Sequence, residues 1–143
     1  PLPYPTDEEN KLNVKCPSGN CGRPLCAEQF ISGTGFTDIF NKKYNTNFTT
    51  TEIVELDKNN DDRAKLEISL YEDRMARLMA VMVGIFDPDV IVLGGGMSNI
   101  ERLYKNIHPL IPKYTFAKKI ETKVVKNLHG DSSGVRGAAW LWK

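Results

Sequence analysis

Three closely spaced cysteines stand near the beginning of the sequence, in the segment CPSGNCGRPLCAEQ. An odd number of cysteines without a secretion signal argues against a disulfide framework. Clustered thiolates suit a tetrahedral zinc ion, and Cys16, Cys21 and Cys26 could supply three of its four ligands. The two histidines, His108 and His129, lie far along the chain, so no local fourth ligand accompanies the thiols. The spacing favours a metal site over the alternative of three unrelated buried thiols.

A second pattern is an apolar run that ends in glycines, within the segment DPDVIVLGGGMS. Gly94, Gly95 and Gly96 directly follow the β-branched residues of this run. A buried strand that leads through glycines into a helix is a place where backbone amides approach a phosphate or nucleotide. The same glycines can instead serve only to permit a tight turn. On these residues alone, both interpretations stay open.

Two further features carry weaker indications. Glu28 follows Cys26 by two residues, and a carboxylate held beside a metal thiolate would suit hydrogen bonding to sugar hydroxyls. A surface glutamate is the more common outcome for a residue of this type. Near the end of the chain, Gly134 and Gly137 lie in HGDSSGVRGAAWLW, where small residues favour close packing of a helix. Helix packing is therefore the preferred interpretation of that segment.

The elements that must position these residues begin with helices. Short helices are expected from near Ala27, from about Phe36 to Tyr44, and up to Lys58 with Thr50 or Thr51 as N-cap. A longer helix follows, because apolar residues recur at steps of three and four and should form one buried stripe. This stripe contains Ile68, Tyr71, Met75, Leu78, Met79, Met82, Ile85 and Phe86. The pair Asp87-Pro88 should end the helix.

The second half of the chain alternates strands and helices. The continuous apolar run at 90–93 predicts a strand buried on both faces. A helix is expected at about 98–108, a second strand at 123–127 and a closing helix at 135–142. This order of elements is typical of an α/β fold.

Composition excludes several classes of protein. The 143 residues suit one domain, and 19 basic against 18 acidic residues give no reason to expect a nucleic acid or membrane surface as partner. No apolar run approaches the roughly 20 residues of a membrane span, and no signal peptide is recognisable. A cytoplasmic protein is the default expectation. The opening PLPYPTDEEN resembles a connector, so the chain is expected to be cut from a longer protein.

Taken in order, three motifs resemble the C-terminal half of the ROK family (repressors, open reading frames, kinases). They are CGRPLCAEQFISGTGF, DPDVIVLGGGMSN and GDSSGVRGAAWLW, and they look most like those of bacterial fructokinases and mannokinases. The resemblance implies an actin- and hexokinase-like (ribonuclease H-like) fold of two α/β domains, of which this chain would hold an incomplete sheet. It divides the chain into a connector and zinc loop at 1–26 and a partial kinase domain at 27–143. The last helix would pack on the absent N-terminal domain.

The resemblance also implies roles for individual residues. Cys16, Cys21 and Cys26 match the thiolates that hold a structural zinc together with an upstream histidine, and Glu28 matches a glutamate that contacts sugar hydroxyls. The glycine run 94–96 matches the segment beside the nucleotide. ATP and Mg²⁺ would be the other cofactors. The catalytic aspartate and the phosphate loop belong to the N-terminal half, so no residue of this chain is assigned as the catalytic base.

The implied function is phosphorylation of a hexose, fructose or a related sugar, by ATP. The expected partners are the N-terminal half of the same kinase and, for the intact protein, a second copy in a homodimer. The alternative is a sugar-responsive ROK transcriptional repressor, whose helix-turn-helix would lie ahead of this chain. The terminal GDSSGVRGAAWLW favours the kinase branch. A stand-alone zinc module would not explain the glycine run or the closing helix.

Overall fold

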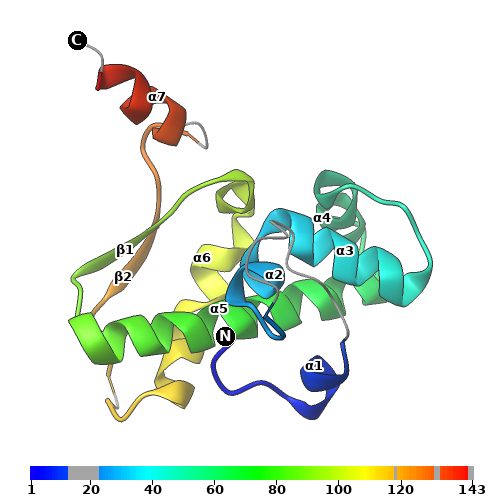
Figure 1. Cartoon of the computed structure of the whole chain (residues 1–143), viewed down its shortest axis with the longest axis horizontal. Coiled ribbons are helices and arrows are strands. Elements are labelled where there is room, and N and C mark those ends of the chain that lie inside the picture. Colours follow the sequence, from blue (N-terminus) through cyan, green and yellow to red (C-terminus); the bar gives the residue numbers. More distant parts are fainter. Residues whose placement is uncertain (13–22, 118, 131–132, 142–143) are drawn as a thin grey trace.

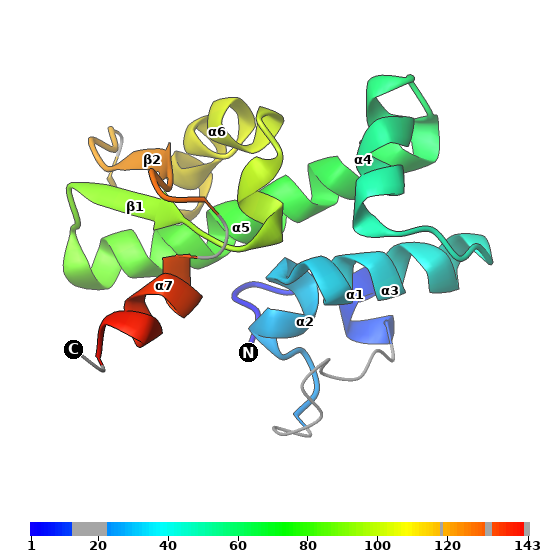
Figure 2. The ribbon, with the colours of Figure 1, turned by 90° about the horizontal axis from the view of Figure 1, so that it is seen from above.

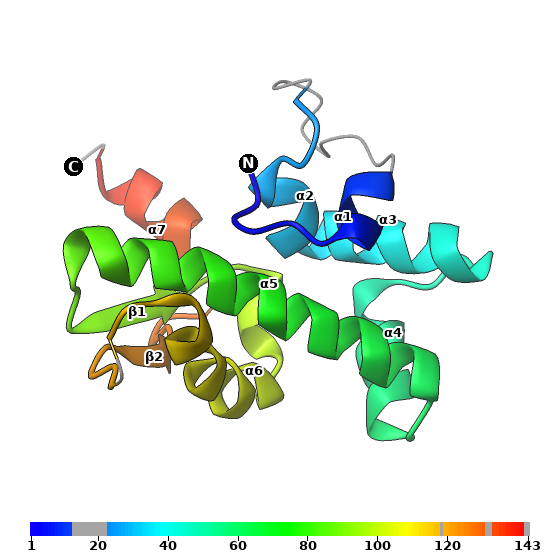
Figure 3. The same cartoon turned by 90° about the horizontal axis from the view of Figure 1, so that it is seen from below.

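The computed structural model describes residues 1–12, 23–117, 119–130 and 133–141. The long helix α5 (Asp62–Phe86) runs through the middle of the molecule (Figure 1). The helices that precede it are α1 (Asp7–Lys11), α2 (Ala27–Ile31), α3 (Gly33–Tyr44) and α4 (Thr50–Lys58). The elements that follow it are β1 (Val90–Leu93), η1 (Gly96–Asn99), α6 (Arg102–Asn106), η2 (His108–Tyr114), β2 (Lys123–Lys126) and α7 (Ser133–Trp140). Helices α1 to α3 lie on one side of α5, and β1, β2 and α6 lie on the other (Figures 2 and 3).

Helix α5 is defined at both ends by aspartates. The Asp61 side chain accepts hydrogen bonds from the backbone N–H groups of Arg63 and Ala64, which caps the first turn. Asp87 ends the helix in the left-handed conformation, with φ of 43°. The predicted stop at Asp87-Pro88 is therefore confirmed.

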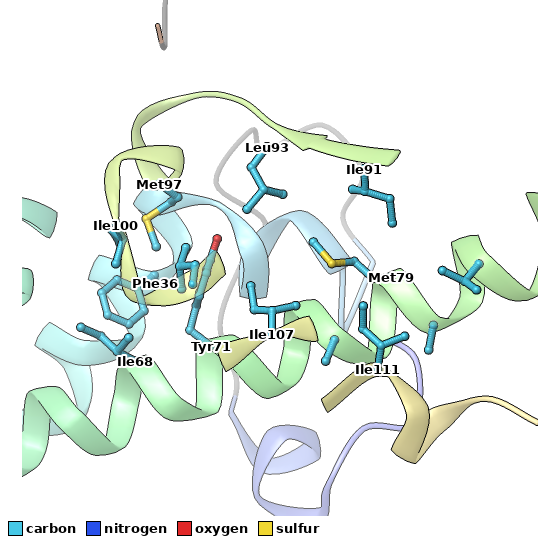
Figure 4. Close-up of a cluster of buried hydrophobic side chains, with 14 of the residues drawn as sticks. Phe36, Ile68, Tyr71, Met79, Ile91, Leu93, Met97, Ile100, Ile107 and Ile111 are labelled. Carbon is cyan, nitrogen blue, oxygen red and sulfur yellow. The ribbon is translucent and has the colours of Figure 1, made fainter. Parts of the chain in front are cut away.

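The buried stripe of α5 is shorter than the apolar pattern predicts. Ile68, Tyr71 and Met79 are buried in the main core, in which the ring of Tyr71 meets Phe36 edge to face at 5.6 Å (Figure 4). Met82, Ile85 and Phe86 also belong to the predicted stripe, but they are exposed. The prediction is wrong for these three, because no described element covers the last turn of the helix on that side.

The two predicted strands form a parallel pair, in which Val90 faces Lys123 and Leu93 faces Lys126. Ile91 and Leu93 are buried and point toward α5 (Figure 4). The expectation that β1 is buried on both faces is wrong, because Val90 and Val92 are 44% and 58% exposed. Among the described residues, helices cover only one face of this two-stranded sheet.

The segment after the glycine run is not the single helix predicted at 98–108. It consists of the short α-helix α6 between two 3₁₀ helices, η1 and η2. Ile100 adopts an extended conformation between η1 and α6 and so interrupts the helical path. The predicted closing helix is confirmed as α7, which points away from the body of the molecule and exposes Val135 and Trp140 (Figure 1).

The helices before α5 follow the predictions with small shifts. Helix α3 begins at Gly33 rather than near Phe36, and Ser32 caps it by accepting from the N–H of Gly35. Helix α4 is capped by Thr49, not by Thr50 or Thr51, and Thr49 and Glu52 form a reciprocal capping box. The first turn of α3 requires a glycine, because a Cβ on Gly35 would lie 1.9 Å from the Gln29 carbonyl oxygen of α2.

The first twelve residues, predicted to belong to a connector, include the short helix α1 (Asp7–Lys11) and pack on α5. Glu9 is buried and lies 2.7 Å from Arg74 Nε and 2.6 Å from Arg77 Nη2. Arg77 also donates to the carbonyl oxygens of Pro3 and Tyr4. These ion pairs and hydrogen bonds fix the segment to the middle of the long helix. The predicted division at residue 26 stays a prediction.

Candidate functional site

A cavity of about 1050 Å³ lies between the glycine run and the first helices of the chain. Its lining comes from the α2–α3 turn and the start of α3, from α4, from the middle of α5, and from the residues 93–100 together with Leu103. All three predicted glycines, Gly94, Gly95 and Gly96, are in this lining. The structure therefore places the glycine run at a cavity large enough for a small-molecule ligand.

The backbone of the glycine run has a conformation that needs glycine at one position. Gly95 has φ of 70° and ψ of −178°, a region essentially restricted to glycine. A Cβ added to Gly94, Gly95 or Gly96 would meet no other atom within 4 Å. The space beside all three residues is thus open, and close approach of a ligand to the backbone is sterically allowed.

Two polar side chains support this turn. Ser98 is buried, and its Oγ donates to the carbonyl oxygen of Gly95 at 2.6 Å. Asn127, directly after β2, donates from Nδ2 to the Leu93 carbonyl oxygen at 3.1 Å and to Ser98 Oγ at 3.0 Å. The Asn127 side chain therefore joins the carboxyl ends of both strands and holds the start of the turn.

The opposite wall of the cavity is formed by the α2–α3 turn and α4. The hydroxyl groups of Thr37 and Thr50 lie 2.7 Å apart and link α3 to α4. Across the cavity, a Cβ on Gly33 would lie 3.4 Å from Met97 Sδ, so the start of α3 closely approaches η1. This wall therefore contributes threonine side chains to the cavity lining.

The floor of the cavity is apolar and anchored by a buried tyrosine. Tyr71 and Met75 of α5 lie beside Leu93, Ile100 and Leu103 in the lining. Burial raises the pKa of the Tyr71 hydroxyl, so this group stays protonated and donates to the Ile31 carbonyl oxygen at 2.8 Å. The combination of an apolar floor with hydroxyl groups and open glycine backbone suits a flat ring carrying polar substituents.

Glu28 lies in the first turn of α2 and is exposed. It is not among the residues that line the cavity, so the structure does not bring it together with the glycine run. Its predicted contact with sugar hydroxyls would take place on a different surface and stays a prediction.

The predicted metal site falls largely outside the described residues. Cys16 and Cys21 lie in the segment 13–22, which the structure does not describe. Cys26 is described, is half-buried and immediately precedes α2. Across the described ranges, no group of three or more histidine, cysteine, aspartate or glutamate side chains is arranged to hold a metal ion. The described residues do not by themselves form a zinc site, and the zinc stays a prediction.

The residues that sequence reasoning did not identify at this site are mainly polar. Ser98 directly follows the predicted glycine run, so its position alone was a usable signal. Asn127 and the pair Thr37 and Thr50 carry no such signal, because only the folded chain brings Asn127 to Ser98 and the two threonines to the cavity. None of the helices in the described ranges has the length and apolar character of a membrane span.

Comparisons with known proteins identify relatives of this chain. Among sequences, the N-acetyl-D-glucosamine kinase of Photobacterium profundum is 34% identical over 139 residues, covering 96% of this chain and 46% of that protein. Among structures, the chain superposes on a ROK family glucokinase from Streptomyces griseus, in complex with glucose and AMPPNP, with a TM-score of 0.74. The identity is 20%, and the match covers 85% of this chain and 45% of the glucokinase.

A ROK hexokinase from Thermus thermophilus gives a TM-score of 0.72 at 23% identity, covering 85% of this chain and 42% of the hexokinase. These structural matches confirm the expected actin-like α/β kinase fold, of which this chain forms the C-terminal part. The chain spans less than half the length of the curated relatives it matches. The sequence model of the ROK family matches residues 10–143 of this chain. The chain is a member of the ROK family.

Proposed function

We propose that the chain supplies the nucleotide-binding half of an ATP-dependent sugar kinase. The observation that carries the proposal is the position of Gly94, Gly95 and Gly96 in the lining of a large, partly apolar cavity. The adenosine part of ATP would lie over the apolar floor, and Mg²⁺ would enter with the phosphates. Similarity to kinases that act on N-acetyl-D-glucosamine supports a kinase over a repressor.

Nucleotide binding can be tested on the chain itself, because described residues from α3, α4, α5 and the glycine run line the cavity. Titration calorimetry with Mg-AMPPNP should give saturable one-to-one binding. Gly94→Leu should abolish it without unfolding the chain, because a Cβ there meets no other atom within 4 Å. Gly84→Leu, on the surface of α5, is the matched control and should bind like the unaltered chain. A folded chain that binds no nucleotide would overturn the proposal.

The sugar would be phosphorylated at a hydroxyl group, with Glu28 contacting other hydroxyls and the catalytic base supplied from outside this chain. The motifs favour fructose or a related hexose. The curated relatives, which are N-acetylglucosamine kinases, add N-acetylglucosamine to the sugars worth testing. In the kinase reconstituted with its N-terminal half, Glu28→Gln should raise the KM for the sugar and leave the KM for ATP unchanged, and a reversed pattern would remove Glu28 from the sugar site.

The N-terminal half of the kinase would cover the apolar surfaces that the described residues leave open. Val90 and Val92 form an exposed face of β1, and α7 exposes Val135 and Trp140. In this proposal α7 packs on the N-terminal half, and the assembled kinase forms a homodimer. The chain alone should bind the dye ANS strongly, and addition of the N-terminal half should reduce that signal. An unchanged signal in a formed complex would show that these faces are not the contact.

Structural zinc is the third element of the proposal. Cys16, Cys21 and Cys26 would supply three thiolates, and a histidine of the N-terminal half would complete the tetrahedron. The chain alone should therefore bind zinc weakly, and the assembled kinase should bind it tightly. Metal analysis after dialysis against a chelator distinguishes the two. Tight one-to-one binding by the chain alone would contradict the predicted missing ligand.

A further inference from the structure

Arg102, the first residue of α6, contacts two other helices. Its Nε donates to Glu72 Oε1 of α5 at 2.7 Å and its Nη2 to Glu72 Oε2 at 3.1 Å. Its Nη1 donates a short hydrogen bond to Asp57, in the last turn of α4. One guanidinium group therefore ties α4, α5 and α6 together. The contacts link residues that are 30 and 45 positions apart in the sequence.

The ion pairs of Arg102 with Asp57 and Glu72 are partly shielded from water. The Arg102 side chain is 27% exposed, while the side chains of Asp57 and Glu72 are 10% and 4% exposed. Glu72 also accepts from Asn106 Nδ2 at 3.0 Å, so its buried carboxylate is well supplied with donors. Partly buried, bidentate contacts of this kind hold their geometry far better than exposed ion pairs.

The tie lies beside the candidate nucleotide cavity. Helix α4 forms one wall through Thr50, Val54 and Glu55, and the residues 93–100 with Leu103 form another. The first turn of α4 is fixed to α3 by the Thr37–Thr50 hydrogen bond. Within the described residues, the hydrogen bond from Arg102 to Asp57 holds the last turn of α4 in a similar way.

We infer that Arg102 and Asp57 are positioning residues that hold the α4 wall at the distance from the glycine run which nucleotide binding requires. The inference rests on the proposed nucleotide site. Neither side chain lines the cavity, so both act through the placement of α4. Lysine cannot replace Arg102, since an ammonium group cannot hold Glu72 in bidentate fashion while also reaching Asp57.

Asp57→Ala is the sharpest variant, because it cuts the link to α4 and leaves the Arg102–Glu72 pair in place. Its dissociation constant for Mg-AMPPNP should rise about three- to tenfold, the range typical of coupling through a packed network. Asp57→Glu keeps the carboxylate and should recover most of the affinity. Arg102→Lys should weaken binding, and adding Asp57→Ala to it should weaken binding little further, because both changes break the same link.

The matched control is Glu101→Ala, which removes a carboxylate from the exposed pair with Lys126 next to Arg102. It should leave nucleotide affinity unchanged. Hydrogen exchange followed by mass spectrometry gives a second readout, and amides of α4 should exchange faster in Asp57→Ala. A dissociation constant equal to that of the unaltered chain, in a folded Asp57→Ala variant, would overturn the inference and leave the proposed nucleotide site standing. No binding by the unaltered chain would overturn both.

Discussion

Asn127 Nδ2 lies 3.0 Å from Ser98 Oγ, although the two residues are 29 positions apart in the sequence. The Ser98 hydroxyl in turn donates a hydrogen bond to the Gly95 carbonyl oxygen at 2.6 Å. The end of β2 therefore supports the glycine turn that follows β1. Because the turn is itself open to the cavity, these two hydrogen bonds fix the backbone that would face a nucleotide.

Removing either side chain should loosen the turn and reduce nucleotide affinity. Ser98→Ala deletes one buried hydrogen bond to the turn and should cost about 1 kcal/mol in the free energy of unfolding. Asn127→Ala removes the contacts to both Leu93 and Ser98. It should weaken nucleotide binding at least as much as Ser98→Ala does. Calorimetric titration with Mg-AMPPNP measures the effect. Asn10→Ala, on the exposed side of α1, is the control, and equal affinities in all three variants would show that the turn does not depend on these contacts.

Gly95→Ala should disturb the turn through its backbone. The φ of 70° with ψ of −178° is a glycine conformation, and placing alanine there should cost on the order of 1–3 kcal/mol. No steric clash adds to this cost, because the space around the new Cβ is open. Gly96→Ala provides the comparison, since no left-handed φ is found there. Equal thermal stability of the two variants would contradict the account of the turn.

Gly35→Ala should be the more damaging glycine substitution. Its Cβ would lie 1.9 Å from the Gln29 carbonyl oxygen, and backbone cannot move away as a side chain can. We expect a loss of about 3 kcal/mol or more in the free energy of unfolding. Gly84→Ala on α5 should instead be neutral or stabilising, because its Cβ meets nothing and alanine favours a helix. Thermal or urea unfolding of the two variants gives the comparison.

The buried Glu9 makes stability sensitive to acid. Burial raises the pKa of this carboxyl group, but hydrogen bonds from Arg77 and Arg74 outweigh burial and lower the pKa from 4.5 to about 2. A lowered pKa in the folded state stabilises the fold above the unfolded-state pKa and loses that stabilisation as the pH falls toward 2. The full contribution above pH 4.5 is about 3 kcal/mol.

Urea unfolding of the unaltered chain and of Glu9→Gln, compared from neutral pH down to about pH 3, measures this contribution. The variant should lose most of the acid dependence that the pair creates. Glu8→Gln, on the exposed side of the same helix, should retain it. An unchanged pH profile in Glu9→Gln would show that the ion pairs with Arg74 and Arg77 do not stabilise the fold.

Local signals in the sequence were sufficient for most of the elements. The β-branched run at 90–93, bounded by turn residues, predicts β1 correctly, and Asp87-Pro88 predicts the end of α5. The pattern could not show that Val90 and Val92 are exposed, because an apolar run does not say which face is covered. The break at Ile100 was also missed, since the side chains on either side of it fit a continuous helix.

The site was predictable only where its residues are contiguous. Gly94, Gly95 and Gly96 were identified from their position after a strand, and the structure places them at the cavity. Asn127 and the Arg102–Asp57 pair support the walls of the site through tertiary contacts over long sequence separations, which no local pattern encodes. Glu28 and the cysteines were assigned by resemblance to the ROK family. Their roles depend on surfaces beyond the described residues.

The most direct test of the central claim is reconstitution of the kinase. The chain is mixed with the N-terminal half of a ROK sugar kinase, and ATP-dependent ADP formation is followed with N-acetylglucosamine, glucose, mannose and fructose in turn. The account predicts no activity from either half alone and sugar-dependent ADP formation from the mixture, lost in Gly94→Leu. The absence of sugar-dependent ADP formation from a folded complex of the two halves, with every sugar, would contradict it.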